Sequence, residues 1–357
     1  MNRTWKIRVT GRLCALAIVM VAGCGSPSDQ GEAAGGSPGG SAKGGTGPRL
    51  LFITNSNADW WNAVEKGMLD GGAEFGAQVE LRRNEGQPEG QIRLLEDALS
   101  LPDVKGVAVS VLEAESPGIA DKMRDLQRQG KIVIAIDSDG QADARRAYIG
   151  TNNRRAGESA GRAAASLRPE GGETAVFVGK AAAANAIERR EGFFEGAGPA
   201  FKQVEVFTDD ADKNRAQVNV QTAITKYPDL GVFLGLWSYN APRIAEEVGK
   251  SPGLRKRANV VTFDLDELAV EHVEAGRIDV TVCQNPYEMG YQGVRLLKAL
   301  IEKDTKTVDE MLPNGATVID TGVRVIVPSK DSPVKGDNVI DIQEMKSWLA
   351  SKGLKSS

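Results

Sequence analysis

The sequence predicts an α/β protein with two doubly wound lobes, each built on a parallel sheet covered by helices. From Arg49 onward, short runs of β-branched and other apolar residues alternate with stretches of helical length. The apolar runs are continuous, as expected for strands that are buried on both faces of a parallel sheet. A new series of such runs begins after Gly150, which indicates two sheets rather than one.

The expected elements follow one another regularly along the chain. The first series predicts strands at residues 50–54, 78–82, 106–111 and 131–136, with helices at 60–76, 88–101 and 117–129 between them. The second series predicts helices at 154–167, 186–196, 215–226 and 242–249, and strands at 174–178, 204–207, 231–235 and 259–263. Further helices are expected at 267–275, 287–303 and 343–352, and further strands at 278–283 and 323–327. The helix at 343–352 is assigned to neither lobe.

The N-terminus has the pattern of a lipoprotein signal. Four basic residues precede an apolar run at 13–22, which is too short to span a bilayer because a spanning helix needs about 20 residues. The run ends in Val-Ala-Gly-Cys, and small residues before a cysteine are typical of cleavage next to an acylated cysteine. We therefore predict a signal peptide over 1–23, lipidation of Cys24 and a flexible Gly/Ser/Pro tether over 24–48. The alternative is an ordinary cleaved signal with a chance cysteine.

Composition excludes several classes of function. The chain has 44 basic and 48 acidic residues and no basic run, which disfavours nucleic-acid binding. Beyond Cys14 and Cys24 there is one cysteine, Cys283, which we predict to be a small buried hydrophobe with no disulfide partner. The only histidine, His272, is expected on an exposed helix face. This inventory predicts no metal site, no cofactor and no catalytic residue.

Polar and aromatic residues follow the predicted strands at their carboxyl ends, where ligands bind in open α/β sheets. Carboxylates and amides can each engage two neighbouring hydroxyls, and aromatic rings cover the C–H faces of a sugar ring. Taken singly, each has an alternative reading, because an aspartate after a strand is often a turn residue and Trp61 alone would more often be core. Together they predict a sugar site that includes Asn57, Trp60, Trp61, Asp137, Asp264 and Gln284.

Five segments extend this pattern over most of the chain. They are Thr-Asn-Ser-Asn-Ala-Asp-Trp-Trp at 54–61, Ile-Ala-Ile-Asp at 134–137, Asn-Ala-Ile-Glu-Arg-Arg-Glu-Gly-Phe at 185–193, Val-Thr-Phe-Asp at 261–264 and Thr-Val-Cys-Gln-Asn-Pro at 281–286. In order and spacing, residues 49–328 resemble the ribose/galactose-type periplasmic binding proteins, which share their fold with the core of lac-repressor-type regulators. The resemblance implies the type I fold of that family, with three hinge crossings, near 151–152, 263–284 and 320–322.

The resemblance also implies domain limits and further site residues. Lobe one would comprise 49–151 and 285–320, lobe two 152–284 and 321–328, and 329–357 would be a C-terminal extension. Arg189 occupies the family's ligand-binding arginine position. The segment at 237–240 replaces a common Asn-Asp, and Trp237, Ser238 or Asn240 could each face the site, Trp237 being the residue we predict to bind the ligand. The sequence departs from many relatives at Ser138, where they have arginine, and at Lys213, where they often have an aromatic residue.

The predicted function is an extracytoplasmic receptor that captures a monosaccharide, a pentose or hexose, between two closing lobes and delivers it to an ABC transporter permease. Its predicted partners are that sugar, the permease and, through Cys24, the membrane; the protein is expected to be a monomer. The alternative is a sensory receptor that presents the sugar to a chemoreceptor or a membrane kinase. A glycosidase using Asp137 and Asp264 lacks a catalytic motif, so no enzymatic activity is predicted.

Overall fold

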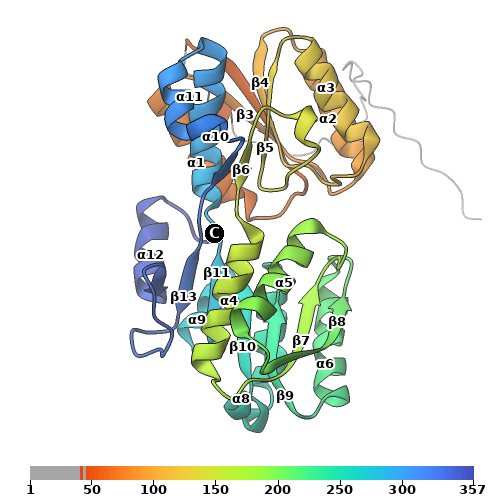
Figure 1. The fold of residues 1–357 in the computed structure, drawn as a ribbon, viewed down its shortest axis with the longest axis vertical. Coiled ribbons are helices and arrows are strands. Elements are labelled where there is room, and N and C mark those ends of the chain that lie inside the picture. Colours follow the sequence, from red (N-terminus) through yellow and green to blue (C-terminus); the bar gives the residue numbers. More distant parts are fainter. Residues whose placement is uncertain (1–40, 43–45) are drawn as a thin grey trace, which may run out of the picture. The chain divides into compact units, whose positions relative to one another are not determined.

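The computed structural model describes residues 41–42 and 46–357. The predicted signal peptide, Cys24 and most of the predicted tether lie outside the described residues. Within them, the chain forms two seven-stranded sheets, each with helices on both faces (Figure 1). The predicted fold class is therefore confirmed.

The first sheet has the strand order β1-β3-β2-β4-β5-β6-β12. Its strands are β1 (Ser41–Ala42), β2 (Arg49–Ile53), β3 (Gln78–Arg82), β4 (Val104–Val109), β5 (Ile132–Ile136), β6 (Tyr148–Gly150) and β12 (Val318–Asp320). All neighbours are parallel except β1, which is antiparallel to β3. Leu50 and Phe52 of β2 point to one face of the sheet, Leu51 and Ile53 to the other, because successive side chains of a strand alternate.

The helices of this first lobe pack on those two faces. Helices α1 (Trp61–Phe75) and α10 (Pro286–Glu302) cover one face, whereas α2 (Pro88–Leu99) and α3 (Pro117–Arg128) cover the other. A short helix, α11 (Thr305–Met311), follows α10. Each face thus has its own apolar core, which is why the strands read as continuous apolar runs.

The second sheet has the order β14-β13-β11-β10-β9-β7-β8. Its strands are β7 (Gly172–Val178), β8 (Phe201–Thr208), β9 (Leu230–Gly235), β10 (Asn259–Phe263), β11 (Val280–Cys283), β13 (Arg324–Val327) and β14 (Val339–Asp341). Only the β11–β13 pair is antiparallel. Helices α4 (Asn153–Leu167) and α5 (Ala184–Ala197) cover one face. The other face carries α6 (Lys213–Lys226), α7 (Asn240–Gly249), α8 (Pro252–Arg257), α9 (Glu267–Glu274) and α12 (Ile342–Ser351).

The segment after Pro328 belongs to this second lobe. Strand β14 pairs in parallel with β13, and Ile342, Met345 and Leu349 of α12 are buried in the core beneath the sheet. The sequence did not assign the segment to a lobe because a three-residue strand is too short to show a period. The same reason explains why β6 and β12 were not predicted.

The chain passes between the two sheets three times, between β6 and α4, between β11 and α10, and between β12 and β13.

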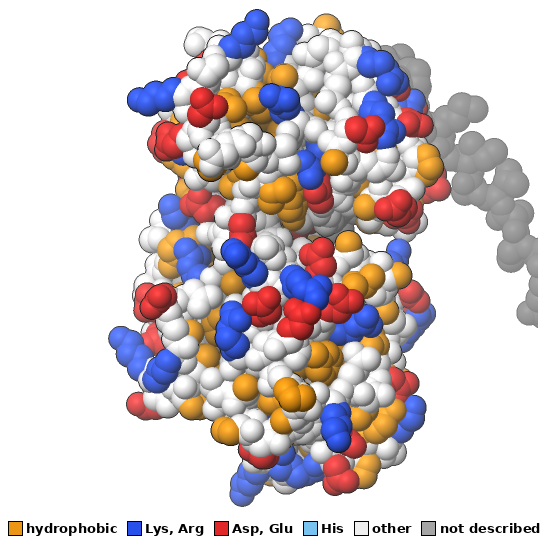
Figure 2. All heavy atoms as spheres, in the orientation of Figure 1, with side chains coloured by type: hydrophobic (Ala, Val, Ile, Leu, Met, Phe, Trp, Pro, Cys, Tyr) orange, Lys and Arg blue, Asp and Glu red, His pale blue; other side chains and the backbone are white. Residues whose placement is uncertain are grey.

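The side chains on the face drawn in Figure 2 are of both charges, interspersed with apolar and neutral ones. None of the described helices is both long and apolar enough to cross a membrane.

Cys283 and His272, the two residues considered above as possible reactive or metal-binding groups, were predicted to differ in exposure. Cys283 is fully buried, as predicted. The prediction of an exposed His272 was wrong: the side chain is 8 % exposed, and its Nδ1 accepts a hydrogen bond of 2.6 Å from Arg277 Nε. Burial and the neighbouring Arg277 lower the pKa of His272, so it is held neutral.

Helices α4 and α5 approach each other through glycines. A Cβ on Gly157 would lie 2.3 Å from the carbonyl oxygen of Arg189, and one on Gly192 would lie 2.1 Å from that of Arg154. Backbone therefore lies against backbone at this crossing, because no side chain intervenes. The contact fixes the position of α5, and with it that of Arg189.

Substitution of Gly192 by valine is expected to lower the free energy of unfolding by about 1–3 kcal/mol, because the added side chain must push the two helices apart. Urea unfolding monitored by circular dichroism measures the change. Gly253→Val is the matched control, because a Cβ on that glycine meets nothing within 4 Å. Equal stability of the two variants would contradict the close packing.

Candidate ligand-binding site

The candidate site is built from residues that follow the carboxyl ends of strands in both sheets. Asp137 follows β5, Asp264 follows β10 and Gln284 follows β11. The two aspartates have left-handed backbones, with φ of 60° and 62°. That conformation is rare for residues other than glycine, but aspartate and asparagine tolerate it better than most. In both lobes the chain turns sharply at the end of a strand and leaves a carboxylate at the sheet edge.

Asp137 is held by neutral donors, and one of its oxygens is left free. Its Oδ2 accepts hydrogen bonds from Ser110 Oγ at 2.9 Å, Ser138 Oγ at 3.1 Å and Asn55 Nδ2 at 3.4 Å. No described residue donates to Oδ1. The backbone oxygen of Asp137 accepts a bond from the Tyr148 hydroxyl at 2.7 Å, which fixes the turn. The free oxygen is therefore available to a ligand hydroxyl.

Burial raises the pKa of Asp137 to about 6, although the bond from Ser110 and the charge of Arg189 oppose the shift. The buried charge of Asp264 adds to the increase. Arg189 and Asp264, which lie in the second lobe, thus both act on the carboxyl of Asp137, which lies in the first lobe. The ionisation of Asp137 consequently depends on what faces it across the site.

Ligand affinity is expected to fall about tenfold when the pH is lowered from 7 to 5. The free carboxyl takes up a proton as the pH falls through about 6, whereas a carboxylate that accepts ligand hydroxyls has a lower pKa. Binding therefore releases a proton below pH 6, and affinity is constant above pH 7. Calorimetry over pH 5–8 measures this. Asp137→Asn should flatten the profile and the exposed Asp229→Asn should not; a flat wild-type profile would contradict the assignment.

Arg189 is the largest charged group in the site and is 2 % exposed. Its Nε donates to Asn153 Oδ1 at 3.0 Å, and its Nη1 donates to the backbone oxygen of Leu236 at 2.8 Å. The guanidinium carbon lies 4.8 Å from the centroid of the Phe263 ring, a cation–π contact. These contacts fix the plane of the guanidinium and leave Nη2 with no described partner.

Asp264 lies next to this guanidinium. Its Oδ2 is 3.8 Å from Arg189 Nη1, and its Oδ1 accepts a bond of 3.0 Å from Gln284 Nε2. Burial raises the pKa of Asp264, and Arg189 and Gln284 oppose that rise. The hydroxyl of Thr281 donates to its backbone oxygen at 2.6 Å. Arg189, Asp264 and Gln284, which come from three different segments, therefore form one connected polar group.

The two predicted tryptophans lie in different environments. Their rings pack edge to face with centroids 5.0 Å apart. Trp61 is 1 % exposed in the core of the first lobe, and its Nε1 donates to Ser56 Oγ at 3.1 Å. Trp60 is partly exposed, and its buried indole N–H makes no hydrogen bond of good geometry, although it is near enough to the Asp264 carboxyl to lower the pKa of that group. Trp60 is thus the member of the pair that can face a ligand, and the expectation for Trp61 is corrected to a core role.

Asn57 also lies outside the group. It is exposed, and its Nδ2 donates to Glu85 Oε1 at 3.3 Å. The neighbouring Asn55, which bonds both Asp137 and Ser138, is the residue of this loop that joins the carboxylate network. The sequence analysis named Asn57 and not Asn55, because both asparagines follow the same strand and only the path of the loop separates them.

Trp237 follows β9 in the second lobe and is partly exposed. Its Nε1 donates to Asn185 Oδ1 at 3.2 Å, and its ring lies so close to Gly179 that a Cβ there would be 2.1 Å away. Its backbone N–H donates to Asn240 Oδ1 at 3.2 Å. Trp237 is thus held rigidly at the carboxyl edge of the second sheet.

A buried carboxylate that the sequence analysis missed supports this segment. Asp209 is fully buried and accepts bonds from Asn240 Nδ2 at 3.0 Å and from the Tyr239 hydroxyl. It follows β8 directly, so the rule that identified Asp137 and Asp264 would have found it. Ser110, which follows β4, was missed because the predicted strand at 106–111 extended past it, whereas β4 ends at Val109. Asn153 lies at the start of α4, and no pattern in the sequence pointed to it.

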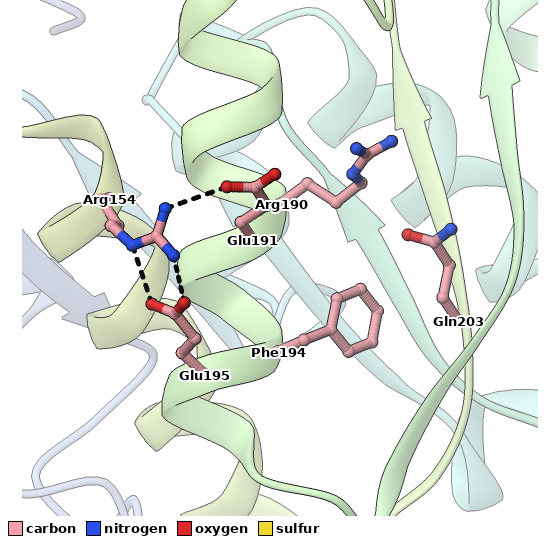
Figure 3. A pocket seen from close by; sticks show the side chains of 6 residues that line it. All are labelled: Arg154, Arg190, Glu191, Phe194, Glu195 and Gln203. Carbon is pink, nitrogen blue, oxygen red and sulfur yellow. Dashed lines mark hydrogen bonds and ion pairs between the residues drawn. The ribbon is translucent and has the colours of Figure 1, made fainter.

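An open depression of about 740 Å³ on the second lobe is unrelated to this group (Figure 3). It is lined by Arg154, Arg190, Glu191, Phe194, Glu195 and Gln203. Arg154 pairs with Glu191 at 2.9 Å and with Glu195 in the same region. Arg154 and the two glutamates satisfy one another, Arg190 forms no described ion pair, and the depression contains none of the predicted site residues.

Comparison with known proteins identifies the family. Residues 50–305 match the model of the periplasmic binding protein domain, which is more than half of the chain. The chain belongs to the periplasmic binding protein family. Membership implies an extracytoplasmic location and a binding protein rather than an enzyme, as predicted.

Individual periplasmic binding proteins are similar to this chain over most of their length. The D-allose-binding periplasmic protein of Escherichia coli K12 is 28 % identical over 260 residues, covering 70 % of this chain and 82 % of that protein. A solute-binding protein of an ABC transporter from Burkholderia graminis, solved with D-arabinose, has a TM-score of 0.73 and 25 % identity, covering 83 % of this chain and 99 % of its own. GanP, a glucose-galactose binding protein of Geobacillus stearothermophilus, has a TM-score of 0.70 and 25 % identity, with coverages of 81 % and 99 %.

Proposed function

We propose that this protein is an extracytoplasmic receptor that captures a monosaccharide between its two lobes and delivers it to an ABC transporter permease. One observation carries the proposal: Arg189 in the second lobe is near enough to Asp137 in the first to lower the pKa of its carboxyl, and each of the two groups has a polar atom with no described partner. A ligand with neighbouring hydroxyls satisfies both, since it accepts from Arg189 and donates to Asp137.

The remaining groups fit the same ligand. Asp264 and Gln284 provide further acceptor oxygens next to Arg189. Trp60 and Trp237 offer partly exposed aromatic rings, one from each lobe, and aromatic rings pack well on the apolar face of a sugar. The relatives named for D-allose, D-arabinose and glucose-galactose support a pentose or hexose as the ligand class.

A thermal-shift screen of the purified chain against pentoses, hexoses, sugar phosphates and polyols tests the proposal, with D-allose and D-arabinose in the panel. A ligand at 100 times its Kd stabilises the native state by about 2.7 kcal/mol, which raises the Tm clearly. We expect one neutral monosaccharide to stand out and calorimetry to give one site per chain. Asp137→Asn should weaken that response and Asp229→Asn should not. No response to any sugar would refute a monosaccharide ligand.

We further propose that Cys24 carries a lipid that anchors the receptor to the membrane, and that the receptor is monomeric. The Val-Ala-Gly-Cys sequence before residue 25 supports the anchor, and two or more acyl chains are enough for stable anchoring. Cell fractionation should place the wild-type protein with membranes and a Cys24→Ala variant in the soluble extracytoplasmic fraction, and mass spectrometry should find acyl chains only on the former. Equal fractionation of the two would rule out the anchor. Sugar uptake by cells lacking the protein distinguishes transport from a sensory role.

A further inference from the structure

The C-terminal helix α12 lies on the second lobe and reaches the hinge. Its apolar residues Ile342, Met345 and Leu349 are buried beneath the second sheet, so the helix moves with that lobe. In Figure 1 it lies beside β13, and the C-terminal end of the chain lies where the chain passes between the lobes. Two other residues of this segment, Trp348 and Lys352, face the crossings.

Trp348 contacts residues of two hinge crossings. The guanidinium carbon of Arg324, which begins β13 after the third crossing, lies 4.3 Å from the centroid of the Trp348 ring. The ring of Tyr287, which follows the second crossing, packs edge-on against Trp348 with centroids 6.2 Å apart. The ammonium of Lys352 lies 4.3 Å from the centroid of the same Tyr287 ring.

Tyr287 belongs to the first lobe, so these contacts join the two lobes. It lies at the start of α10, and its hydroxyl donates to Asp70 Oδ2 of α1 at 2.9 Å. Burial alone would raise the pKa of Asp70, but bonds from Lys66 and Tyr287 and the charge of Lys352 lower it. A residue of the second lobe thus acts on a carboxylate of the first.

The crossings themselves leave polar atoms unsatisfied in this arrangement. Each has a buried side-chain atom with no hydrogen-bond partner among the described residues: Thr151 Oγ1, Asn285 Oδ1 and Arg324 Nη1. Such atoms are costly to leave unpaired. These unpaired atoms oppose this arrangement of the lobes, whereas hydrogen bonds from Thr321 N to the Gly150 oxygen at 2.8 Å and from Asn152 N to Asp320 Oδ1 at 3.2 Å join the first and third crossings. The contacts of α12 add to these bonds at the second and third crossings.

We propose that Trp348 and Lys352 form a strap across the hinge, and that these positioning residues set the ligand affinity without touching the ligand. The strap stabilises the arrangement in which Asp137 of the first lobe and Arg189 of the second face the same candidate site. The effect on affinity rests on the proposed function, whereas the effect on the hinge does not. The C-terminal segment then takes part in setting how the two lobes are arranged.

Hydrogen exchange of the ligand-free full chain, together with calorimetry, tests the strap. Trp348→Ala is expected to speed exchange in the hinge peptides and in α1 around Asp70, and to raise the Kd about three- to tenfold, the effect of losing an aromatic contact. Trp348→Phe should restore most of both, because it keeps an aromatic ring against Tyr287. Lys352→Ala should give a smaller change in the same direction and disturbs the core less.

Lys346→Ala is the matched control, because Lys346 lies on the same helix and pairs with Glu274 inside the second lobe. It should leave both readouts unchanged. Faster exchange confined to α12 and the second sheet would overturn the strap, and an unchanged Kd in Trp348→Ala would overturn its effect on ligand affinity. If no sugar binds the wild-type chain, the proposed function fails, and exchange in α1 of the ligand-free variants still decides whether the strap exists.

Discussion

Arg189→Ala is expected to weaken sugar binding about 10- to 100-fold and to destabilise the fold. The lost interaction is a charge-assisted hydrogen bond to the ligand, worth about 1.5–3 kcal/mol. The fold suffers because Asn153 and the backbone oxygen of Leu236 lose a buried donor, and Asp264 loses the cation beside it. Removing one partner of a buried pair costs about 3–5 kcal/mol, and protonation of Asp264 offsets part of that cost.

The pH dependence separates the electrostatic effect of Arg189 from simple misfolding. Arg189 lowers the pKa of both Asp137 and Asp264. Without it, the pKa of Asp137 rises above about 6, so the fall in affinity on acidification begins at a higher pH. Calorimetry at several pH values measures the shift.

Arg190→Ala is the matched control for this experiment. It is the next residue on α5, forms no described ion pair and lines the open depression rather than the site. Wild-type affinity for Arg190→Ala and a large loss for Arg189→Ala would support the assignment. Similar affinities for the two variants would show that the guanidinium of Arg189 does not reach the ligand.

Trp61→Ala is expected to have the largest effect on stability, lowering the free energy of unfolding by about 3–5 kcal/mol. Trp61 is 1 % exposed and packs against Val64 and Met68 in the core of the first lobe. Its removal leaves a large cavity and an unpaired Ser56 hydroxyl. Chemical unfolding measures the loss.

Trp60→Ala should instead have a small effect on stability and a larger one on ligand affinity. Trp60 is partly exposed, so its loss should change stability much less, and affinity should fall about three- to tenfold through lost stacking. The comparison of two adjacent tryptophans controls for residue type and for position in the chain. A stable Trp61→Ala variant with weak binding would reverse the roles that we assign to the two rings.

The sequence alone determined the two doubly wound lobes and predicted most of the polar groups of the candidate site. Buried parallel strands need continuous apolar runs, and a ligand at the carboxyl edge of a sheet needs polar residues directly after them. Asp137, Asp264 and Gln284 follow from these two local rules, and Arg189 follows from the resemblance of residues 185–193 to the family's binding motif. All four are encoded within a few residues of one element.

Only the tertiary structure decided which of two neighbouring residues lies in the core and which can face a ligand. Trp60 and Trp61 are equivalent in the sequence, but the 3.6-residue period of α1 turns Trp61 into the core alongside Val64 and Met68. His272 is buried because Arg277 folds back onto it, five residues along the chain. The contacts of Trp348 with Tyr287 and Arg324 join elements that the sequence predicted singly but that are distant from one another along the chain, so the role of the C-terminal segment became visible only once the chain was folded.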